Sequence, residues 1–328
     1  MHLHARPTNL TIKANPKTNI MIKKNILFRL PLTLLVFLLP LLTTAQEMLV
    51  GTYNIRYKNN DDSLKGDAWS KRCQVICDQV NFMAPAVLGT QEVLHAQLGD
   101  MMKRLDGYDY IGVGRDDGKE QGEYAAILYK KDRLQLLDKG NFWLNETPDV
   151  PRLGWDAACI RICTWGKFKD CQTANEFYFF NLHMDHVGTT ARREGARLVL
   201  RKISEIALGE PVVLTGDFNV DQTDEIYDIL TGAGMLKDSY ACAPVRFAEN
   251  GTFNSFNPYR RTQSRIDHVF VSPSTEVKAY GMLTDHYWMP RQAEDMKGND
   301  ASEELSFQEA TIHLPSDHYP VFVRIHLR

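Results

Sequence analysis

The chain has 328 residues, with 38 Lys and Arg against 41 Asp and Glu, and 44% of its residues are hydrophobic. It contains no low-complexity tract, no linker rich in Pro, Gly or Ser, and no internal repeat, which excludes solenoids and domains joined by a flexible linker. Residues 1–45 hold six basic and no acidic residues, so the remainder has 32 basic against 41 acidic residues and a net charge of about −9. That acidity weighs against tight, non-specific binding of polyanions such as duplex DNA.

Residues 21–45 follow the order of a secretory signal peptide. Two lysines precede an apolar run at 32–42, and the small residues Thr43, Thr44 and Ala45 follow it. The run is too short to span a bilayer comfortably, although an uncleaved membrane anchor is the alternative. We therefore expect 1–45 to be a leader whose signal peptide starts at Met21, and the mature protein to be secreted or periplasmic.

The mature segment, 46–328, is long enough for one large core, and we expect a single domain. An oxidising destination allows disulfides, but six cysteines permit 15 pairings that the sequence does not choose between. Cys73 and Cys77 lie on the apolar stripe of an expected helix, which favours buried thiols over metal ligands. The cysteines are Cys73, Cys77, Cys159, Cys163, Cys171 and Cys242.

In chain order, apolar runs predict many strands and few helices. Strands are expected at 48–56, 86–92, 108–113, 123–130, 134–142, 159–168, 177–183, 212–217, 266–272, 276–285 and 320–327. Helices are expected at 70–84, 94–105, 191–208 and 224–230, and the stretch 251–265 is less regular. Several strands alternate apolar and polar residues, as antiparallel strands with one covered face do. The pattern predicts an α/β fold with two mixed sheets packed face to face and helices outside.

The stretch V-V-L-T-G-D-F-N-V-D at 212–221 is the centre of the prediction. A buried β-branched run leads into Asp217 and Asn219, which lie two positions apart and therefore on one face of an extended chain. A strand here delivers a carboxylate and an amide to one place beyond its end. The alternative is an aspartate that only caps the following turn.

Polar residues follow apolar runs at several other places, and the set is what indicates a site. Any one has an ordinary explanation, such as a core histidine, a turn residue or a helix cap. Carboxylate and amide oxygens are hard ligands that suit Mg²⁺ or Mn²⁺ and suit zinc or copper poorly. Phosphate esters are the natural substrates of such a site. The residues are Asn54, Glu92, His183, Asp217, Asn219, Asp267, Asp317 and His318.

Six ordered motifs resemble those of the endonuclease/exonuclease/phosphatase superfamily, the DNase I-like phosphoesterases. They are T-Y-N-I-R at 52–56, G-T-Q-E-V at 89–93, N-L-H-M-D-H at 181–186, G-D-F-N at 216–219, S-R-I-D-H-V at 264–269 and P-S-D-H-Y-P-V at 315–321. The resemblance covers nearly all of the mature segment. It implies a four-layered α/β sandwich of two mixed, mostly antiparallel sheets, and hydrolysis of a phosphoester with a divalent metal, Mg²⁺ or Mn²⁺.

The resemblance also implies roles for individual residues. Glu92 would be the main metal ligand, assisted by Asn54, with Asp317 a second or water-mediated ligand. Asp217 would orient or deprotonate the attacking water, and Asn219 would hydrogen-bond the phosphate.

Two histidines would stabilise charge on the scissile group, each oriented by a carboxylate. Asp267 matches the partner of His318, and Glu123, in G-E-Y-A-A, matches the partner of His183. Arg161, in C-I-R-I-C, matches a phosphate-contacting arginine. The ordinary alternatives are a surface Glu123 on an edge strand and a solvated Arg161.

One residue departs from part of the superfamily. The base-excision nucleases often place an acid two residues after the first asparagine, and that position is Arg56 here. The chain is more similar to the secreted bacterial and deadenylase-like branches. Asp185 and His186 are expected on a loop that follows their strand.

The sequence leaves the substrate open. The main reading is a secreted phosphoesterase, either a nuclease or a phosphatase or phosphodiesterase for sugar, inositol or lipid head groups, as in sphingomyelinase-like or inositol-phosphatase-like enzymes. The alternative is a catalytically silent binding module on the same fold. We expect a monomer without a stable protein partner. Five aromatic residues are candidates for stacking on a substrate or for the core: Phe253, Phe256, Tyr259, Tyr287 and Trp288.

Overall fold

A computed structural model describes residues 46–248, 250–290 and 309–327. The expected signal peptide and leader lie outside these residues, and so does the predicted start at Met21. The described residues form one compact unit. Within the described part of the chain, the helices are too short or too polar to cross a bilayer.

The first sheet has seven strands in the order β10-β12-β15-β1-β2-β4-β3. β1 pairs in parallel with β2 and antiparallel with β15, which brings the two ends of the domain together at the centre of the sheet. The strands are β1 (Met48–Asn54), β2 (Val87–Val93), β3 (Tyr108–Ile111), β4 (Tyr124–Lys130), β10 (Arg246–Phe247), β12 (Glu276–Met282) and β15 (Val321–His326).

The second sheet has six strands in the order β5-β6-β7-β8-β11-β9. Only β7 and β8 are parallel among the described pairs of this sheet, because a long helix carries the chain from one to the other. The strands are β5 (Leu134–Trp143), β6 (Ile162–Asp170), β7 (Glu176–His183), β8 (Val212–Asp217), β9 (Lys237–Asp238) and β11 (Asp267–Val271).

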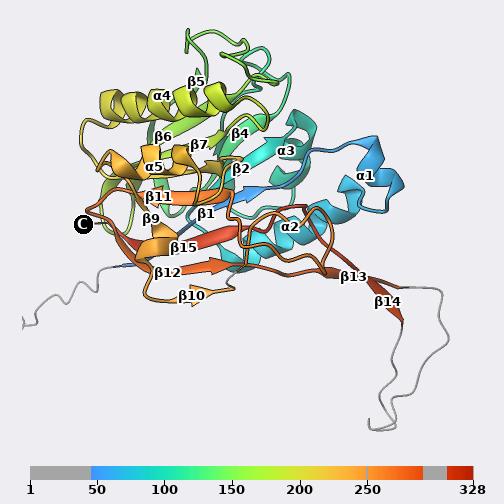
Figure 1. The fold of residues 1–328 in the computed structure, drawn as a ribbon. Helices are drawn as coiled ribbons and strands as arrows, with labels where there is room; N and C mark the ends of the chain where they lie inside the picture. Colours follow the sequence, from blue (N-terminus) through green and yellow to red (C-terminus); the bar gives the residue numbers. More distant parts are fainter. Residues whose placement is uncertain (1–45, 249, 291–308, 328) are drawn as a thin grey trace, which may run out of the picture. The chain divides into compact units, whose positions relative to one another are not determined.

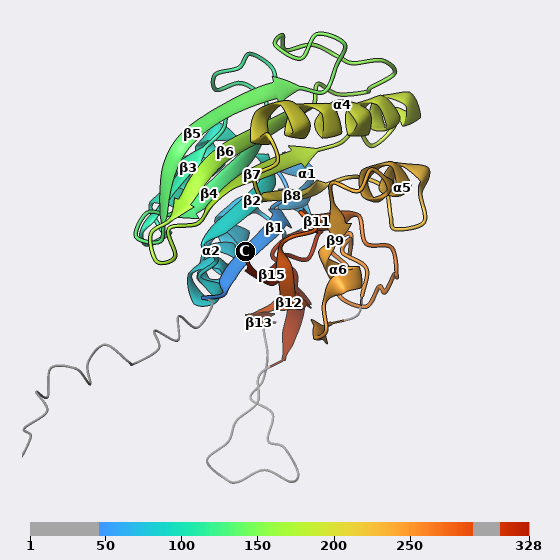
Figure 2. The same ribbon diagram turned by 90° about the vertical axis from the view of Figure 1, so that its left-hand side faces the viewer.

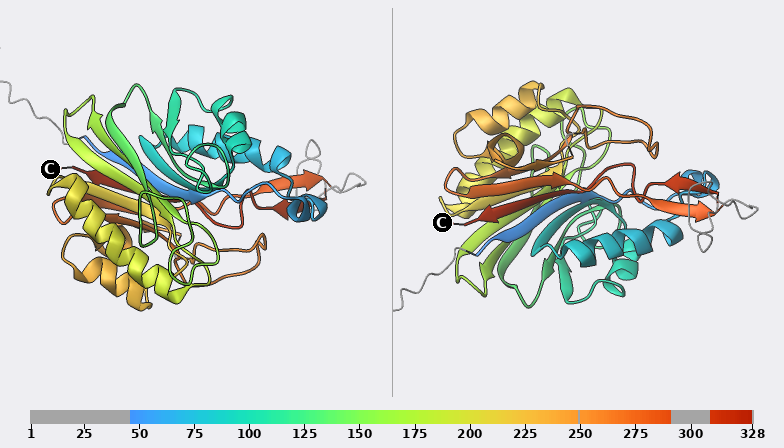
Figure 3. Two further views of the ribbon diagram at one scale, coloured as in Figure 1. Left: turned by 90° about the horizontal axis from the view of Figure 1, so that it is seen from above. Right: turned by 90° about the horizontal axis from the view of Figure 1, so that it is seen from below.

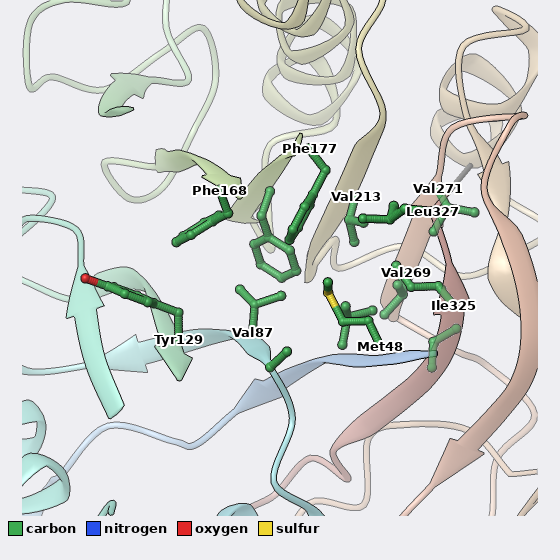
Figure 4. Close-up of a cluster of buried hydrophobic side chains, with 14 of the residues drawn as sticks. Met48, Val87, Tyr129, Phe168, Phe177, Val213, Val269, Val271, Ile325 and Leu327 are labelled. Atoms are coloured by element: carbon green, nitrogen blue, oxygen red, sulfur yellow. The ribbon is translucent and has the colours of Figure 1, made fainter. Parts of the chain in front are cut away.

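Apolar side chains from both sheets fill the space between them. Val50 and Val323 from the first sheet and Phe177 and Val213 from the second are fully buried in one cluster. Figure 4 shows this cluster, with Phe177 directed toward Met48 and Val87, and the Phe168 ring lies 5.2 Å from that of Tyr129. Two sheets packed through such inner faces form the centre of a sandwich.

Helices cover the outer faces. α2 (Trp69–Met83) and α3 (His95–Met102) pack on the first sheet, and α4 (Thr189–Ala207) and α5 (Glu225–Gly232) pack on the second. Figures 1 and 2 show α4 and α5 on one side and α2 on the other, and both views of Figure 3 show the strands between the two groups of helices. The predicted four-layered α/β sandwich is confirmed.

Five short features were missed by the sequence prediction. They are α1 (Asn60–Leu64), α6 (Ser239–Cys242), the two-residue strands β9 and β10, and the hairpin of β13 (Tyr287–Pro290) with β14 (Ala310–His313). Each is too short for a periodic pattern to stand out. Cys73 and Cys77 are buried on α2 as predicted, and all six cysteines, which fall within the described residues, are free thiols.

A buried polar network joins the sheets behind the site. The Gln91 side chain donates to Asn181 Oδ1 over 2.6 Å and to Thr52 Oγ1 over 2.9 Å, and Thr215 Oγ1 also donates to Asn181. Gly89 faces this network, and a Cβ there would collide with Asn181 and Thr215. The close approach of β2 to the second sheet therefore requires glycine at position 89.

Candidate active site

Strand register brings distant polar residues to one edge of the sandwich. His183 at the end of β7 is paired with Asp217 at the end of β8, and Asp217 is paired with Asp267 at the start of β11. In the facing sheet, β1 ends at Asn54 beside Gln91, and Glu92 follows. The ends of the two sheets therefore meet at one place.

Asn54 is the link between the two sheets. Its Nδ2 donates to Asp217 Oδ2 over 3.0 Å and to Glu92 Oε1 over 3.1 Å, and its Oδ1 accepts the backbone N–H of Arg56. Because the amide oxygen is engaged by the backbone, ligation of a metal through it would require the amide to exchange partners. The ligand role of Asn54 stays a prediction.

Three site residues have left-handed backbones. The φ angles of Arg56, Glu92 and Asn219 are 58°, 62° and 52°. Non-glycine residues adopt this region at a cost, and such strain persists where the surrounding structure fixes it, as it does at functional sites. The side chains of all three line the pocket.

His318 bridges two aspartates. Its Nδ1 lies 2.8 Å from Asp267 Oδ2, and its Nε2 lies 3.7 Å from Asp217 Oδ2. Burial alone would lower the pKa of His318, but the charges of Asp267, Asp217 and Asp317 outweigh it and raise this pKa well above its usual range. The ring is therefore an imidazolium that can donate from Nε2.

Asp217 lies at the floor of the site and is 2% exposed. Burial, with the charge of Asp267, raises its pKa to about 7, although His318 and hydrogen bonds from Asn219 and Asn54 act in the opposite direction. A carboxylate that exchanges its proton near neutral pH suits general acid–base chemistry.

His183 differs from His318 in charge. Burial, with the positive charges of Arg161 and Arg115, lowers its pKa well below the usual value, so this imidazole is neutral. Its Nε2 lies 3.1 Å from Asn219 Nδ2, which also donates to the carbonyl of Met184. Nε2 is thus the acceptor and Nδ1 carries the proton, and Nδ1 is buried without a partner among the described residues.

Glu123 does not pair with His183 in this structure, in contrast to the partnership that the resemblance implied. Both of its oxygens accept from Arg115, over 2.6 and 3.0 Å. A permanently charged, bidentate guanidinium is a stronger partner than a neutral imidazole. Glu123 lies in the pocket wall and is not a surface residue of an edge strand.

Arg161 is also buried and not solvated, with 5% of its surface exposed. Its Nε lies 3.5 Å from Asp185 Oδ2, and its Nη2 lies 3.1 Å from the imidazole of His186. Asp185 accepts the backbone N–H groups of Val187, Gly188 and Cys159. Asp185 thus shapes the loop after β7, and Arg161 is directed into the pocket.

The donor set fits a hard divalent cation. Glu92 and Asp317 face each other across the guanidinium of Arg56, which lies 3.9 and 3.6 Å from their oxygens. Burial, with the charge of Glu92, raises the pKa of Asp317, although His318, Arg56 and Arg72 lower it. Two carboxylates that repel each other in a buried place provide hard oxygen donors for Mg²⁺ or Mn²⁺.

A second acidic cluster is less suited to a metal. Asp217, Asp267 and His318 have ligand atoms within 4.8 Å of one another. Both imidazole nitrogens of His318 face carboxylates, so its protonated ring already supplies a cation there. Glu92 and Asp317 are the better donor pair.

These side chains line one pocket of about 550 Å³. Of the ten predicted site residues, eight line it, and Asn54 and Asp267 lie directly behind, hydrogen-bonded to residues of the wall. Sequence reasoning missed Tyr57, Arg115 and Cys159. Arg115 comes shortly after the apolar run of β3. The criterion that identified the other residues, a polar side chain just past an apolar strand, could therefore have identified Arg115. The eight are Glu92, Glu123, Arg161, His183, Asp217, Asn219, Asp317 and His318.

A two-sheet sandwich with acid–base groups, cationic side chains and hard oxygen donors in one pocket defines a phosphoesterase. Residues 51–318 match the Endonuclease/Exonuclease/phosphatase family, and the chain belongs to it. The superfamily that the six motifs indicated is confirmed. Divalent-metal dependence is typical of this family.

Several proteins of known structure or curated function are similar to this chain. A mannosyl-6-phosphatase of Bacteroides thetaiotaomicron VPI-5482 is 50% identical, with a TM-score of 0.79 over 85% of this chain and 99% of that one. A family protein of Bacteroides vulgatus is 38% identical, with a TM-score of 0.73 over 86% and 100%. Human tyrosyl-DNA phosphodiesterase 2 is 26% identical over 49% of this chain and 40% of its own length. The chain spans 31% to 60% of the lengths of the first three curated relatives it matches.

Proposed function

We propose that this protein is a secreted, divalent-metal-dependent phosphatase that hydrolyses sugar phosphate monoesters. The observation that carries the proposal is the pocket in which Asp217 lies between a neutral His183 and a protonated His318, with Arg161 in the wall. The 50% identity to a mannosyl-6-phosphatase, over 99% of that chain, supports a sugar phosphate as the substrate.

Asp217 is the proposed base. Its Oδ2 lies 3.4 Å from His183 Nε2 and 3.7 Å from His318 Nε2, so a water beside it can be oriented by the same groups that contact the phosphoryl oxygens. With its pKa near 7, Oδ2 can take the proton of that water. His318 donates from Nε2 to an oxygen that gains charge in the transition state.

Arg161 is the proposed phosphate-binding group, and His183 and Asn219 would join it by exchanging the hydrogen bonds that they now make with each other and with Met184. The guanidinium of Arg161 is suited to bind phosphate oxygens in a bidentate manner.

Glu92 and Asp317, with Asn54, would hold Mg²⁺ or Mn²⁺. When bound, the ion neutralises phosphoryl oxygens and makes phosphorus easier to attack. The protein's part is to hold Glu92 in its left-handed backbone, with Tyr57 N–H donating to Oε2 over 3.2 Å.

The test is a substrate panel with purified 46–328. Release of phosphate, phosphocholine or nucleotides is measured from mannose 6-phosphate, inositol phosphates, sphingomyelin, RNA, and single- and double-stranded DNA, with Mg²⁺, Mn²⁺ or EDTA. We expect the sugar phosphate to have the highest kcat/KM and EDTA to abolish its hydrolysis. A higher value for a nucleic acid or for sphingomyelin would overturn the proposal.

Secretion and oligomeric state are tested separately. We propose that residues 1–45 are removed on export and that the mature protein is a monomer. N-terminal sequencing of the exported protein should begin at Gln46, and light scattering should give the mass of one chain. Recovery of an uncleaved, membrane-bound chain would contradict the first proposal.

A further inference from the structure

The backbone of Arg56 is held on both sides. Its φ of 58° is in the left-handed region, and its N–H donates to Asn54 Oδ1 over 3.0 Å. Its carbonyl accepts from Arg72 over 3.2 Å and from Gln97 over 3.1 Å. Both donors are fully buried. A strained backbone that buried partners hold in place is a reason to look for a function of the side chain.

The guanidinium of Arg56 is oriented by a buried acid. Nε donates to Asp62 Oδ2 over 2.8 Å, and Asp62 is 4% exposed. Asn59 donates to the same carboxylate, and the guanidinium lies 4.9 Å from the centre of the Tyr57 ring. The Nε edge is therefore occupied, and the guanidinium has little freedom to turn.

The other end of this guanidinium faces the pocket. Nη1 lies 3.6 Å from Asp317 Oδ2 and 3.9 Å from Glu92 Oε2, distances too long for hydrogen bonds. Among the described residues, no hydrogen bond ends on Nη1, and 27% of the side chain remains exposed. Arg56 Nη1 is thus ion-paired with two carboxylates but makes no hydrogen bond to a described residue, at the place where the proposed cation site meets the substrate pocket.

Two other arginines line the pocket, and Arg161 is already assigned to the phosphate. Arg115 is committed to both oxygens of Glu123, and Arg161 contacts Asp185 and His186. A phosphate monoester carries nearly two charges above its second pKa of about 6 and has three terminal oxygens, whereas a diester carries one charge and has two. The third oxygen needs a donor that a diester does not.

We propose that Arg56 binds this third oxygen through Nη1 and thereby selects dianionic phosphate monoesters over monoanionic diesters. The inference rests on the proposed function, because it names the residue by which the same site recognises a monoester. It assigns Arg56 to the substrate and not only to charge balance at Glu92 and Asp317.

The test compares two substrates that share a leaving group. kcat and KM are measured at pH 8 with saturating Mg²⁺ for p-nitrophenyl phosphate and for its methyl ester, with wild type and Arg56→Gln. We expect the variant to lose about 100-fold in kcat/KM for the monoester, as loss of one donor to a charged oxygen does, and less than about 3-fold for the diester. The inhibition constant of inorganic phosphate should rise by about 10-fold or more.

Three controls separate recognition from folding. Arg56→Gln leaves Asp62 buried without its cation, so the double variant Arg56→Gln/Asp62→Asn removes both charges and should keep the same selectivity change with a Tm closer to that of wild type. Lys58→Gln makes the same charge change at an exposed neighbouring position and should leave kcat/KM unchanged for both substrates. A Mg²⁺ titration of each variant, followed by thermal shift, measures the affinity of the cation site for Mg²⁺ independently of enzyme activity.

The outcomes are distinct. Equal losses for both substrates, with weaker Mg²⁺ binding, would assign Arg56 to the cation site and overturn the inference. Unchanged selectivity in the folded double variant would overturn it as well. If the wild type prefers the diester, the proposed function is itself wrong and the inference fails with it.

Discussion

Asp267 Oδ2 lies 2.8 Å from His318 Nδ1, although 51 positions of sequence separate the two residues. Both are buried, and the carboxylate fixes the orientation and the charge of the ring. The pair joins β11 of one sheet to the loop before β15 of the other, so the contact exists only when the sandwich is assembled.

Asp267→Asn should lower kcat by about 10- to 100-fold, the usual effect of removing the carboxylate behind a functional histidine. The carboxylate charge is one of the causes that raise the pKa of His318, so the substitution should lower that pKa. NMR titration of the His318 ring measures this directly. An unchanged His318 pKa would show that Asp267 has only a packing role.

Asp217→Asn should reduce kcat by about 10² to 10⁴ while the protein stays folded, because the variant cannot accept a proton from water. The folded-state pKa of Asp217 is raised to about 7, so its ionisation opposes folding. The stability of wild type relative to the variant should therefore fall as pH rises from about 4 to about 7. Urea unfolding in EDTA at several pH values measures the difference, and a difference that does not vary with pH would be inconsistent with a raised pKa.

Asp185→Asn tests the loop that supports Arg161. Burial would raise the pKa of Asp185, but hydrogen bonds from Gly188, Val187 and Cys159 outweigh it and lower this pKa to about 2. A depressed acid pKa stabilises the fold above the unfolded value near 4, and this stability is lost as pH falls from about 4 to about 2.

The Asp185 variant should therefore be about 2 kcal/mol less stable than wild type at pH 7, with the gap closing below pH 2. The free energy of unfolding across this range is the measurement. Asp228→Asn, at an exposed position on α5, is the control and should follow wild type. If the free energy of unfolding depends on pH in the same way for both variants, Asp185 does not stabilise the loop that supports Arg161.

Gly89→Ala tests the close approach of the sheets. The added methyl group would collide with Asn181 Oδ1 and Thr215 Oγ1, which belong to a buried network with few alternatives. We expect a loss of about 1 to 3 kcal/mol in the free energy of unfolding, the usual cost of overpacking. Gly99→Ala on α3 has open space around it and should be neutral or stabilising. A tolerated Gly89→Ala would mean that the sheets can separate slightly without loss.

Most of the fold could be predicted from the sequence because apolar residues recur at regular spacing along its longer strands and helices. Local patterns could not reveal β9, β10 or the β13–β14 hairpin, which are held by pairing with distant partners. The pairing of Asp217 with Asp267 and His183 depends on the order of the strands in the sheet, which the hydrophobic periodicity of the sequence does not predict.

The site shows the same division. Asp217, Asn219 and Glu92 could be found because each follows a buried apolar run. The partner of Glu123 could not be found in this way. Whether Glu123 pairs with Arg115 or with the neutral His183 depends on how the folded chain places the three side chains. The sequence shows that Arg56 departs from part of the superfamily. It does not predict the left-handed backbone that places Arg56 between Glu92 and Asp317.

The most direct test of the account is phosphate release from mannose 6-phosphate by wild-type 46–328 and by Glu92→Gln, in EDTA and after Mg²⁺ is restored. Wild type should be inactive in EDTA and recover fully with Mg²⁺, and Glu92→Gln should require far more Mg²⁺ or remain inactive. Undiminished hydrolysis in EDTA, or a Glu92→Gln variant with wild-type rates at the same Mg²⁺ concentration, would contradict a cation-assisted phosphatase built on these residues.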